Sequence, residues 1–169
     1  MLLTRQQEYM LEVLNRLGCI RTEQLAQLVR RQFSIPSQES AQRIVHAALR
    51  QLAHGNTELR LDEDIAFLGR SGIDHDRLEA IDVMLELADA SLPDFAAEKP
   101  PVLLRFIIRQ KRFAVVSQHQ PLMLPRFYPS EKVIVLQQSH ERPTPWAIPN
   151  TQIFAVRQED GSHRFLTRK

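Results

Sequence analysis

Residues 37–53 hold the side chains best suited to recognise another molecule. Gln can make two hydrogen bonds to adenine, and Arg can make two to guanine. A serine at a helix N-terminus can hold a phosphate, and a later arginine on the same face would reach the DNA backbone. The side chains with this chemistry are Ser37, Gln38, Gln42, Arg43, His46 and Arg50. Their types predict contacts with base edges and phosphates.

A helix is needed to place these side chains on one face, and the apolar residues of the same stretch predict it. They recur at steps of three and four, which is the spacing of one stripe along a helix. The stripe consists of Ala41, Ile44, Val45, Ala48, Leu49 and Leu52.

Two further helices are expected before this one, and a β-hairpin after it. Thr4 and Gln7 form a capping-box pattern for a helix that ends at Gly18. Residues 19–21 are read as a short connector, after which Thr22 is expected to cap a second helix that ends before Pro36. Residues 57–61 and 65–68 alternate around a polar turn, which indicates a hairpin. This order predicts a winged helix-turn-helix domain over residues 1–72.

Residues 73–169 predict a second domain, a helix with a mixed β-sheet. The helix spans about 74–89, with Glu79 and Glu86 on its expected solvent face, and residues 91–101 read as a loop because they contain three prolines. About five strands are expected, with the third near the centre of the sheet. They are residues 102–108, 113–116, 132–136, 153–156 and 163–166. The fold class predicted for the whole chain is therefore α+β.

Charge is distributed unevenly along the chain. Residues 1–72 carry 9 basic and 8 acidic side chains, whereas residues 100–169 carry 11 basic and 4 acidic ones, a net charge of +7. The cationic segment would attract a polyanion. Its expected basic patch comprises Arg105, Arg109, Lys111 and Arg112, and further phosphate contacts are expected from Arg21, Arg30 and Arg31. A solvated sheet edge that discourages strand pairing explains the patch equally well.

Other residues oppose a strong DNA contact by the first domain. The expected wing tip, residues 62–64, is Asp-Glu-Asp, and the predicted recognition helix contains Glu39 and no lysine. Phosphates repel such groups, so a second subunit or the cationic segment would have to add affinity. The alternative is a winged helix that contacts only protein.

The order of elements resembles one known family. A helix such as Leu78–Leu87 follows the winged helix, and then come a strand hairpin, an apolar strand such as Lys132–Leu136 and a final hairpin. This order is similar to that of the replication-relaxation-like proteins of plasmids and conjugative elements and their uncharacterised relatives. The resemblance implies a degenerate restriction-endonuclease-like core and a DNA-associated accessory role in replication, mobilisation or transcription control.

Catalytic patterns are missing from the sequence. A metal-dependent nuclease of this kind needs an Asp and then an acidic residue two positions before a lysine. The acids after residue 100 are Glu131, Glu141, Glu159 and Asp160, and none of them has that spacing. The histidines show no His-x-x-x-His pair, no glycine-rich phosphate loop is present, and Cys19 is the single cysteine. We therefore expect no enzyme activity, no metal and no cofactor.

The sequence thus predicts a cytoplasmic, non-enzymatic protein that binds double-stranded DNA and forms a homodimer. No apolar run approaches the ~20 residues needed to cross a membrane. The alternative is a protein-interaction module whose winged helix docks a replication protein, a relaxase or a toxin.

Overall fold

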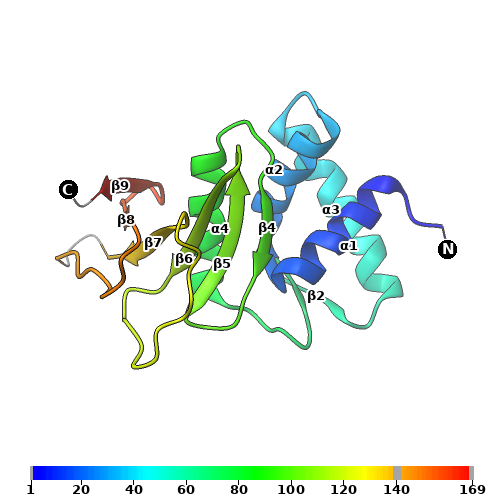
Figure 1. Cartoon of the computed structure of the whole chain (residues 1–169). Coiled ribbons are helices and arrows are strands. Elements are labelled where there is room, and N and C mark those ends of the chain that lie inside the picture. The colour runs from blue at the N-terminus through cyan, green and yellow to red at the C-terminus, as the bar shows by residue number, and fades with distance from the viewer. Residues whose placement is uncertain (1, 139–141, 168–169) are drawn as a thin grey trace. The chain divides into compact units, whose positions relative to one another are not determined.

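The computed structural model describes residues 2–138 and 142–167 (Figure 1). In these residues the fold is α+β, with four helices, a three-stranded sheet and a six-stranded sheet. Two compact units divide the chain. Unit 1 comprises residues 1–78 and 90–92, and unit 2 comprises residues 79–89 and 93–169. Glu141, one of the acids considered above, lies outside the described residues.

The first helix of unit 1 begins and ends where the sequence predicts. In α1 (Arg5–Leu17), the Thr4 hydroxyl accepts the Gln7 amide and the Gln7 side chain accepts the Thr4 amide, both at 3.1 Å. Gly18 ends the helix with φ at +80°. A Cβ at this position would also lie 2.8 Å from the Ser71 hydroxyl, so glycine is required by both backbone and packing.

The second and third helices carry the polar side chains of interest. For α2 (Thr22–Phe33), the predicted N-cap lies one residue too late in the sequence. Thr22 is already helical, and the capping residue is Arg21, whose amide donates to Gln24 Oε1 at 2.9 Å. Before α3 (Gln38–Gly55), the Ser37 hydroxyl accepts the Ser40 amide at 3.1 Å, as expected of an N-cap.

The small sheet of unit 1 includes a strand that the sequence did not predict. The strands β1 (Cys19–Arg21), β2 (Leu59–Asp62) and β3 (Ile65–Leu68) form an antiparallel sheet in the order β1-β3-β2. The prediction of an irregular connector over 19–21 is therefore wrong. These residues form β1, which pairs with β3 and places Cys19 opposite Phe67. Cys19 is fully buried there, and burial raises the pKa of its thiol, which disfavours the reactive thiolate.

Unit 2 contains most of α4 (His75–Ala88) and a mixed sheet. Its strands are β4 (Asp94–Ala97), β5 (Val102–Ile108), β6 (Lys111–Val116), β7 (Lys132–Gln137), β8 (Gln152–Arg157) and β9 (His163–Thr167). They lie in sequence order, with β6-β7 and β7-β8 parallel and the other neighbours antiparallel. The sheet has six strands rather than about five, because β4 lies inside the predicted loop. The prolines of that predicted loop flank β4 and do not interrupt it; they are Pro93, Pro100 and Pro101.

Different layers cover the two faces of this sheet. The α4 helix crosses one face (Figure 1). On the other face, Trp146 packs with Phe154 and with valines from β5, β6 and β7. The Gln152 side chain fixes the Trp146 backbone, accepting its amide at 2.7 Å and donating to its carbonyl at 2.8 Å. The irregular segment around Trp146 therefore forms a fixed cover for the sheet.

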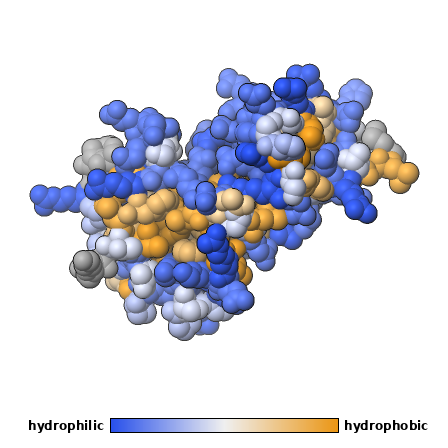
Figure 2. Space-filling view, turned by 90° about the horizontal axis from the view of Figure 1, so that it is seen from above, coloured by the Kyte–Doolittle hydropathy of each residue, from blue (hydrophilic) through white to orange (hydrophobic). Residues whose placement is uncertain are grey.

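The surface is mainly hydrophilic on the face drawn in Figure 2, where apolar residues gather in a patch surrounded by hydrophilic ones. The exposed large apolar side chains include Leu122 and Met123, between two prolines of the segment 118–130. None of the helices in the described part of the chain is long and apolar enough to cross a membrane.

A buried histidine connects α4 to the last strand of unit 2. The His163 ring donates or accepts at both nitrogens, with Nδ1 2.7 Å from Glu86 Oε1 and Nε2 3.0 Å from Glu79 Oε1. The His163 amide also donates to Glu86 at 3.0 Å. The solvent-facing role expected for Glu79 is therefore wrong, since its side chain is only 13% exposed, whereas Glu86 is exposed as expected while it contacts the ring. Burial lowers the pKa of His163, but the hydrogen bonds and charges of the two carboxylates outweigh it and raise the pKa above 6.5.

We predict that the His163 cluster makes stability depend on pH. Because the pKa is higher in the folded state, the protonated ring contributes fully below about pH 6.5 and loses its contribution as the pH rises through the raised pKa. Urea unfolding should therefore show a stability difference between wild type and His163→Gln that is largest at low pH and shrinks above neutrality. The exposed His119 provides the control, since His119→Gln should follow the wild-type pH profile. Identical pH profiles for wild type and His163→Gln would contradict the prediction.

Candidate nucleic-acid interface

The exposed side of α3 presents a row of basic side chains. Its apolar residues Ala41, Val45 and Leu49 are buried, so the opposite side faces water. Arg43, His46 and Arg50 follow one another at steps of three and four and are exposed. The nearest acid, Glu39, lies 3.9 Å from Arg43, with both side chains about four-fifths exposed. Such a pair contributes little and leaves Arg43 available.

The other α3 residues expected to contact DNA have structural contacts. Ser37 caps the helix, and its hydroxyl donates to the Ser40 hydroxyl at 2.9 Å. The Gln38 side chain donates to the Glu23 carbonyl at 3.2 Å, while Gln42 is half-buried. The surface of α3 that is open to a partner therefore centres on Arg43, His46 and Arg50, with Gln42 at its side.

The phosphate contacts expected around α2 also have partners in unit 1. Arg30 donates to the carbonyls of Ile35 and Pro36 at 3.3 and 3.2 Å, so it supports the turn between α2 and α3. Arg31 donates to the Ser91 carbonyl at 3.1 Å. Arg21 is half-buried at the N-terminus of α2. Local structure accounts for Arg30 and Arg31 without a bound phosphate.

The basic hairpin of unit 2 is tighter than the sequence suggested. Arg109 and Gln110 alone form the turn, with φ at 49° and 66°, and β6 already begins at Lys111. Positive φ at both turn residues is the geometry that suits a two-residue hairpin. Arg109, Lys111 and Arg112 are exposed at this tip. The turn therefore holds three cations close together on a fixed backbone.

Arg105, the fourth member of the predicted patch, is neutralised. Its guanidinium lies 3.4 Å from Glu98 and 3.4 Å from Glu131, and it donates to the Arg126 carbonyl at 2.8 Å. Glu131 is almost fully buried and accepts the Tyr128 amide at 3.1 Å. These contacts attach the segment before β7 to the sheet, so Arg105 serves the fold of this segment.

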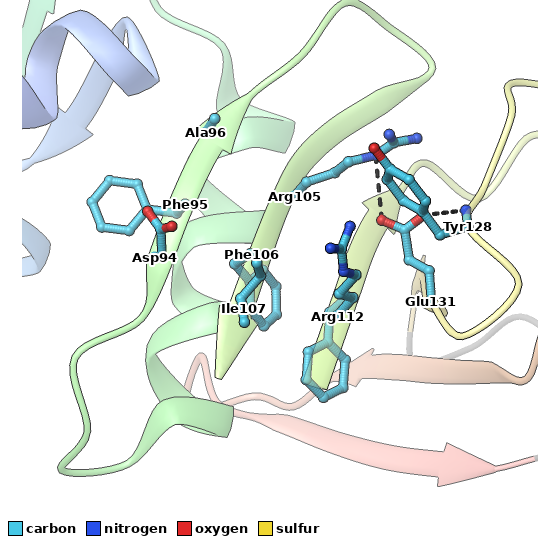
Figure 3. A pocket seen from close by; sticks show the side chains of 10 residues that line it. Asp94, Phe95, Ala96, Arg105, Phe106, Ile107, Arg112, Tyr128 and Glu131 are labelled. Carbon is cyan, nitrogen blue, oxygen red and sulfur yellow. Dashed lines mark hydrogen bonds and ion pairs between the residues drawn. The ribbon is translucent and has the colours of Figure 1, made fainter. Parts of the chain in front are cut away.

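A hollow of about 180 Å³ lies next to this ion pair (Figure 3). Ala96 and Ile107 contribute to its lining from the sheet, and Tyr128 and Glu131 contribute from the neighbouring segment. Arg112 places its guanidinium carbon 4.5 Å from the centre of the Tyr128 ring, a cation–π contact. The Tyr128 ring is half-exposed in this hollow, and only the spatial proximity of Arg112 reveals the site.

Metal ligands do not gather at either surface among the described residues. Among residues 2–138 and 142–167, no three His, Cys, Asp or Glu side chains are grouped as metal ligands would be. The chemistry that the exposed groups of α3 and of the hairpin can perform is hydrogen bonding, ion pairing and stacking.

Comparison with known proteins adds no relative. No protein-family model, curated protein or solved structure matches the chain.

We predict that Glu131 stabilises unit 2. Glu131→Gln would keep the size of the side chain but remove the charge that faces Arg105, so a loss of about 1–3 kcal/mol of unfolding free energy is expected. The urea midpoint measures this loss. Glu98→Gln is the matched control, because Glu98 faces the same arginine with a much more exposed side chain, and it should change stability by less than about 0.5 kcal/mol. Equal effects of the two variants would contradict the prediction.

Proposed function

We propose that the chain is a non-enzymatic DNA-binding accessory or regulatory protein whose α3 helix contacts double-stranded DNA. The observation that supports this most directly is the exposed row Arg43, His46 and Arg50. These side chains lie on a helix whose opposite face is firmly buried, so a duplex would meet them on a rigid support. In this proposal Arg43 would read guanine and Arg50 would contact the backbone.

The order of elements in unit 1 supports a winged helix as its finer description. Three helices and three strands alternate as α1-β1-α2-α3-β2-β3, and the sheet order β1-β3-β2 puts the β2-β3 hairpin at its edge. In a winged helix, the third helix reads the major groove and the hairpin forms the wing. For unit 2 we propose a degenerate restriction-endonuclease-like core, because its sheet is mixed and α4 covers one face.

The charge of unit 1 sets the expected strength of binding. Each phosphate contact adds about 0.9 to the salt slope of duplex binding, and α3 offers only a few cations. We therefore propose modest affinity for one chain, increased by a second copy in a homodimer. The setting on a plasmid or conjugative element rests on the family resemblance alone.

A protein partner is the second candidate, and the tip of the β2-β3 hairpin favours it. Asp62, Glu63 and Asp64 are all exposed there. A DNA phosphate would be repelled by this tip, whereas a basic protein surface would be attracted to it.

We predict that Arg43→Ala/Arg50→Ala weakens duplex binding at least about tenfold. The reason is that a bidentate base contact alone is worth about 1–3 kcal/mol. Fluorescence anisotropy with labelled duplex DNA at several salt concentrations measures the loss, and the salt slope should fall by about 0.9 if Arg50 contacts a phosphate. The control Arg5→Ala/Arg70→Ala removes the same charge from other exposed positions of unit 1 and should have a smaller effect. Absence of wild-type binding at ~50 mM salt would overturn the proposal.

The hairpin tip separates the two candidates. Asp62→Asn/Asp64→Asn removes two negative charges from exposed positions and should increase affinity for duplex DNA if the hairpin approaches phosphates. The same anisotropy assay measures it. An unchanged duplex affinity, together with weaker retention on a cationic protein surface, would favour the protein partner.

A further inference from the structure

We propose that the hollow beside the β5-β6 hairpin holds one base of a single-stranded nucleic acid, while the neighbouring phosphates lie along the hairpin tip. The hollow lies in unit 2 and uses no residue of α3. The proposal therefore stands or falls separately from duplex binding by unit 1.

The size and lining of the hollow suit a flat ring. A volume of about 180 Å³ is below the roughly 300–1,000 Å³ of sites for drug-sized ligands. The sheet contributes the small or apolar side chains of Ala96 and Ile107. Asp94, Ile107 and Arg112 lie opposite one another on adjacent strands, so the hollow extends about 10 Å across three strands. One base fits this space, whereas a duplex does not.

Two planar groups next to the hollow can stack on a base. Tyr128 is 54% exposed, and its ring contacts the Arg112 guanidinium (Figure 3). Unpaired bases stack on aromatic rings and on arginine planes in proteins that bind single strands. The hydrogen bond from the Tyr128 amide to buried Glu131 fixes the backbone of this tyrosine, so little ordering is needed when a base arrives.

The charges inside the hollow favour a base over a phosphate. Asp94 and Glu131 line it together with Arg105 and Arg112, so two negative groups accompany two positive ones. The Glu131–Arg105 ion pair removes one cation from use. The carboxylates would repel a phosphate placed there, whereas they would not repel a neutral base.

The cations outside the hollow favour the phosphates of the same strand. Arg109 and Lys111 are exposed at the hairpin tip, one on each side of Gln110, and the positive φ angles of Arg109 and Gln110 fix the turn. Arg112 follows Lys111 and connects the tip to the hollow. A strand with one base in the hollow would therefore bring its neighbouring phosphates to the cations of the hairpin tip. A duplex keeps its bases paired and stacked, so it cannot use Tyr128, and this site should bind single strands only.

Anisotropy with a short labelled oligodeoxythymidylate tests the proposal on the full chain. Wild type should bind this probe, and Tyr128→Leu should leave the affinity for its duplex with oligodeoxyadenylate unchanged, which separates this site from α3. Tyr128→Leu should weaken binding of the single strand about tenfold and leave the salt slope unchanged, because it removes stacking and no charge. Arg109→Ala removes an exposed cation of the hairpin tip, so it should weaken binding and also lower the slope by about 0.7, the contribution of one phosphate on a single strand.

Three control variants keep the result specific. Tyr128→Phe retains the ring and should bind as wild type does. Arg164→Ala removes one exposed charge from β9, at the other end of the sheet, and should have less than a twofold effect. Arg5→Ala/Arg70→Ala removes two exposed charges from unit 1 and should keep its affinity for the single strand. Circular dichroism on heating shows whether each variant is folded.

Several results would overturn the proposal. They are the absence of single-strand binding by wild type at low salt, a loss of duplex affinity in Tyr128→Leu equal to its loss of single-strand affinity, and wild-type single-strand affinity in a folded Tyr128→Leu variant. Loss of single-strand binding in Arg43→Ala/Arg50→Ala would assign the site to α3 instead.

Discussion

Exclusion of one apolar stripe from water determines which side chains α3 can offer. Ala41, Val45, Ala48, Leu49 and Leu52 are buried on the same side of the helix. Burying a side chain such as Val or Leu is worth about 1.5–3 kcal/mol, so turning the helix by one position would expose several such groups and bury Arg43 or His46. The exposure of Arg43, His46 and Arg50 therefore follows from the core. The core fixes the direction in which these three side chains point, but it does not fix which residue types stand there.

Burial of apolar side chains also decides which side chains unit 2 exposes, here through the two-residue alternation of a β-strand. Successive residues of β5 and β6 point to opposite faces, so Phe106 and Phe113 pair on the face that α4 covers, with ring centroids 5.1 Å apart. Arg105, Ile107 and Arg112 consequently lie on the other face. The segment before β7 covers only part of this face, because the Arg105–Glu131 pair and the Tyr128 amide attach it there. The hollow is the uncovered remainder.

Local patterns predicted most helices and strands but not the contacts that join distant segments. The cap at Thr4, the stop at Gly18, the start of α3 at Ser37 and the strands from β5 to β9 all have signals within a few residues. The strands β1 and β4 are three and four residues long, too short for periodicity, and they exist because a neighbouring strand pairs with them.

Side-chain pairing across long sequence separations was equally invisible to local patterns. Glu86 and His163 are 77 residues apart, and Arg105 finds Glu131 only when the segment before β7 returns to the sheet. The solvent-facing role expected for Glu79 failed for this reason. Glu79 and Glu86 of α4 are the partners of a buried imidazole.

In the folded chain, some cations of residues 100–169 are paired with carboxylates and others are exposed, a difference that the net charge does not show. The +7 of residues 100–169 is a sum over groups with different surroundings. Arg105 is offset by two carboxylates, whereas Arg109 and Lys111 stand at an exposed turn and Arg112 lies against an aromatic ring. A uniform basic surface would attract any polyanion through its phosphates alone. Here the cations lie on a tight turn, and the hollow beside them has no net charge and an aromatic wall. Only a ligand with both phosphates and an accessible ring can contact the cations and the hollow together. The arrangement therefore distinguishes an open strand from a closed duplex, which total charge does not.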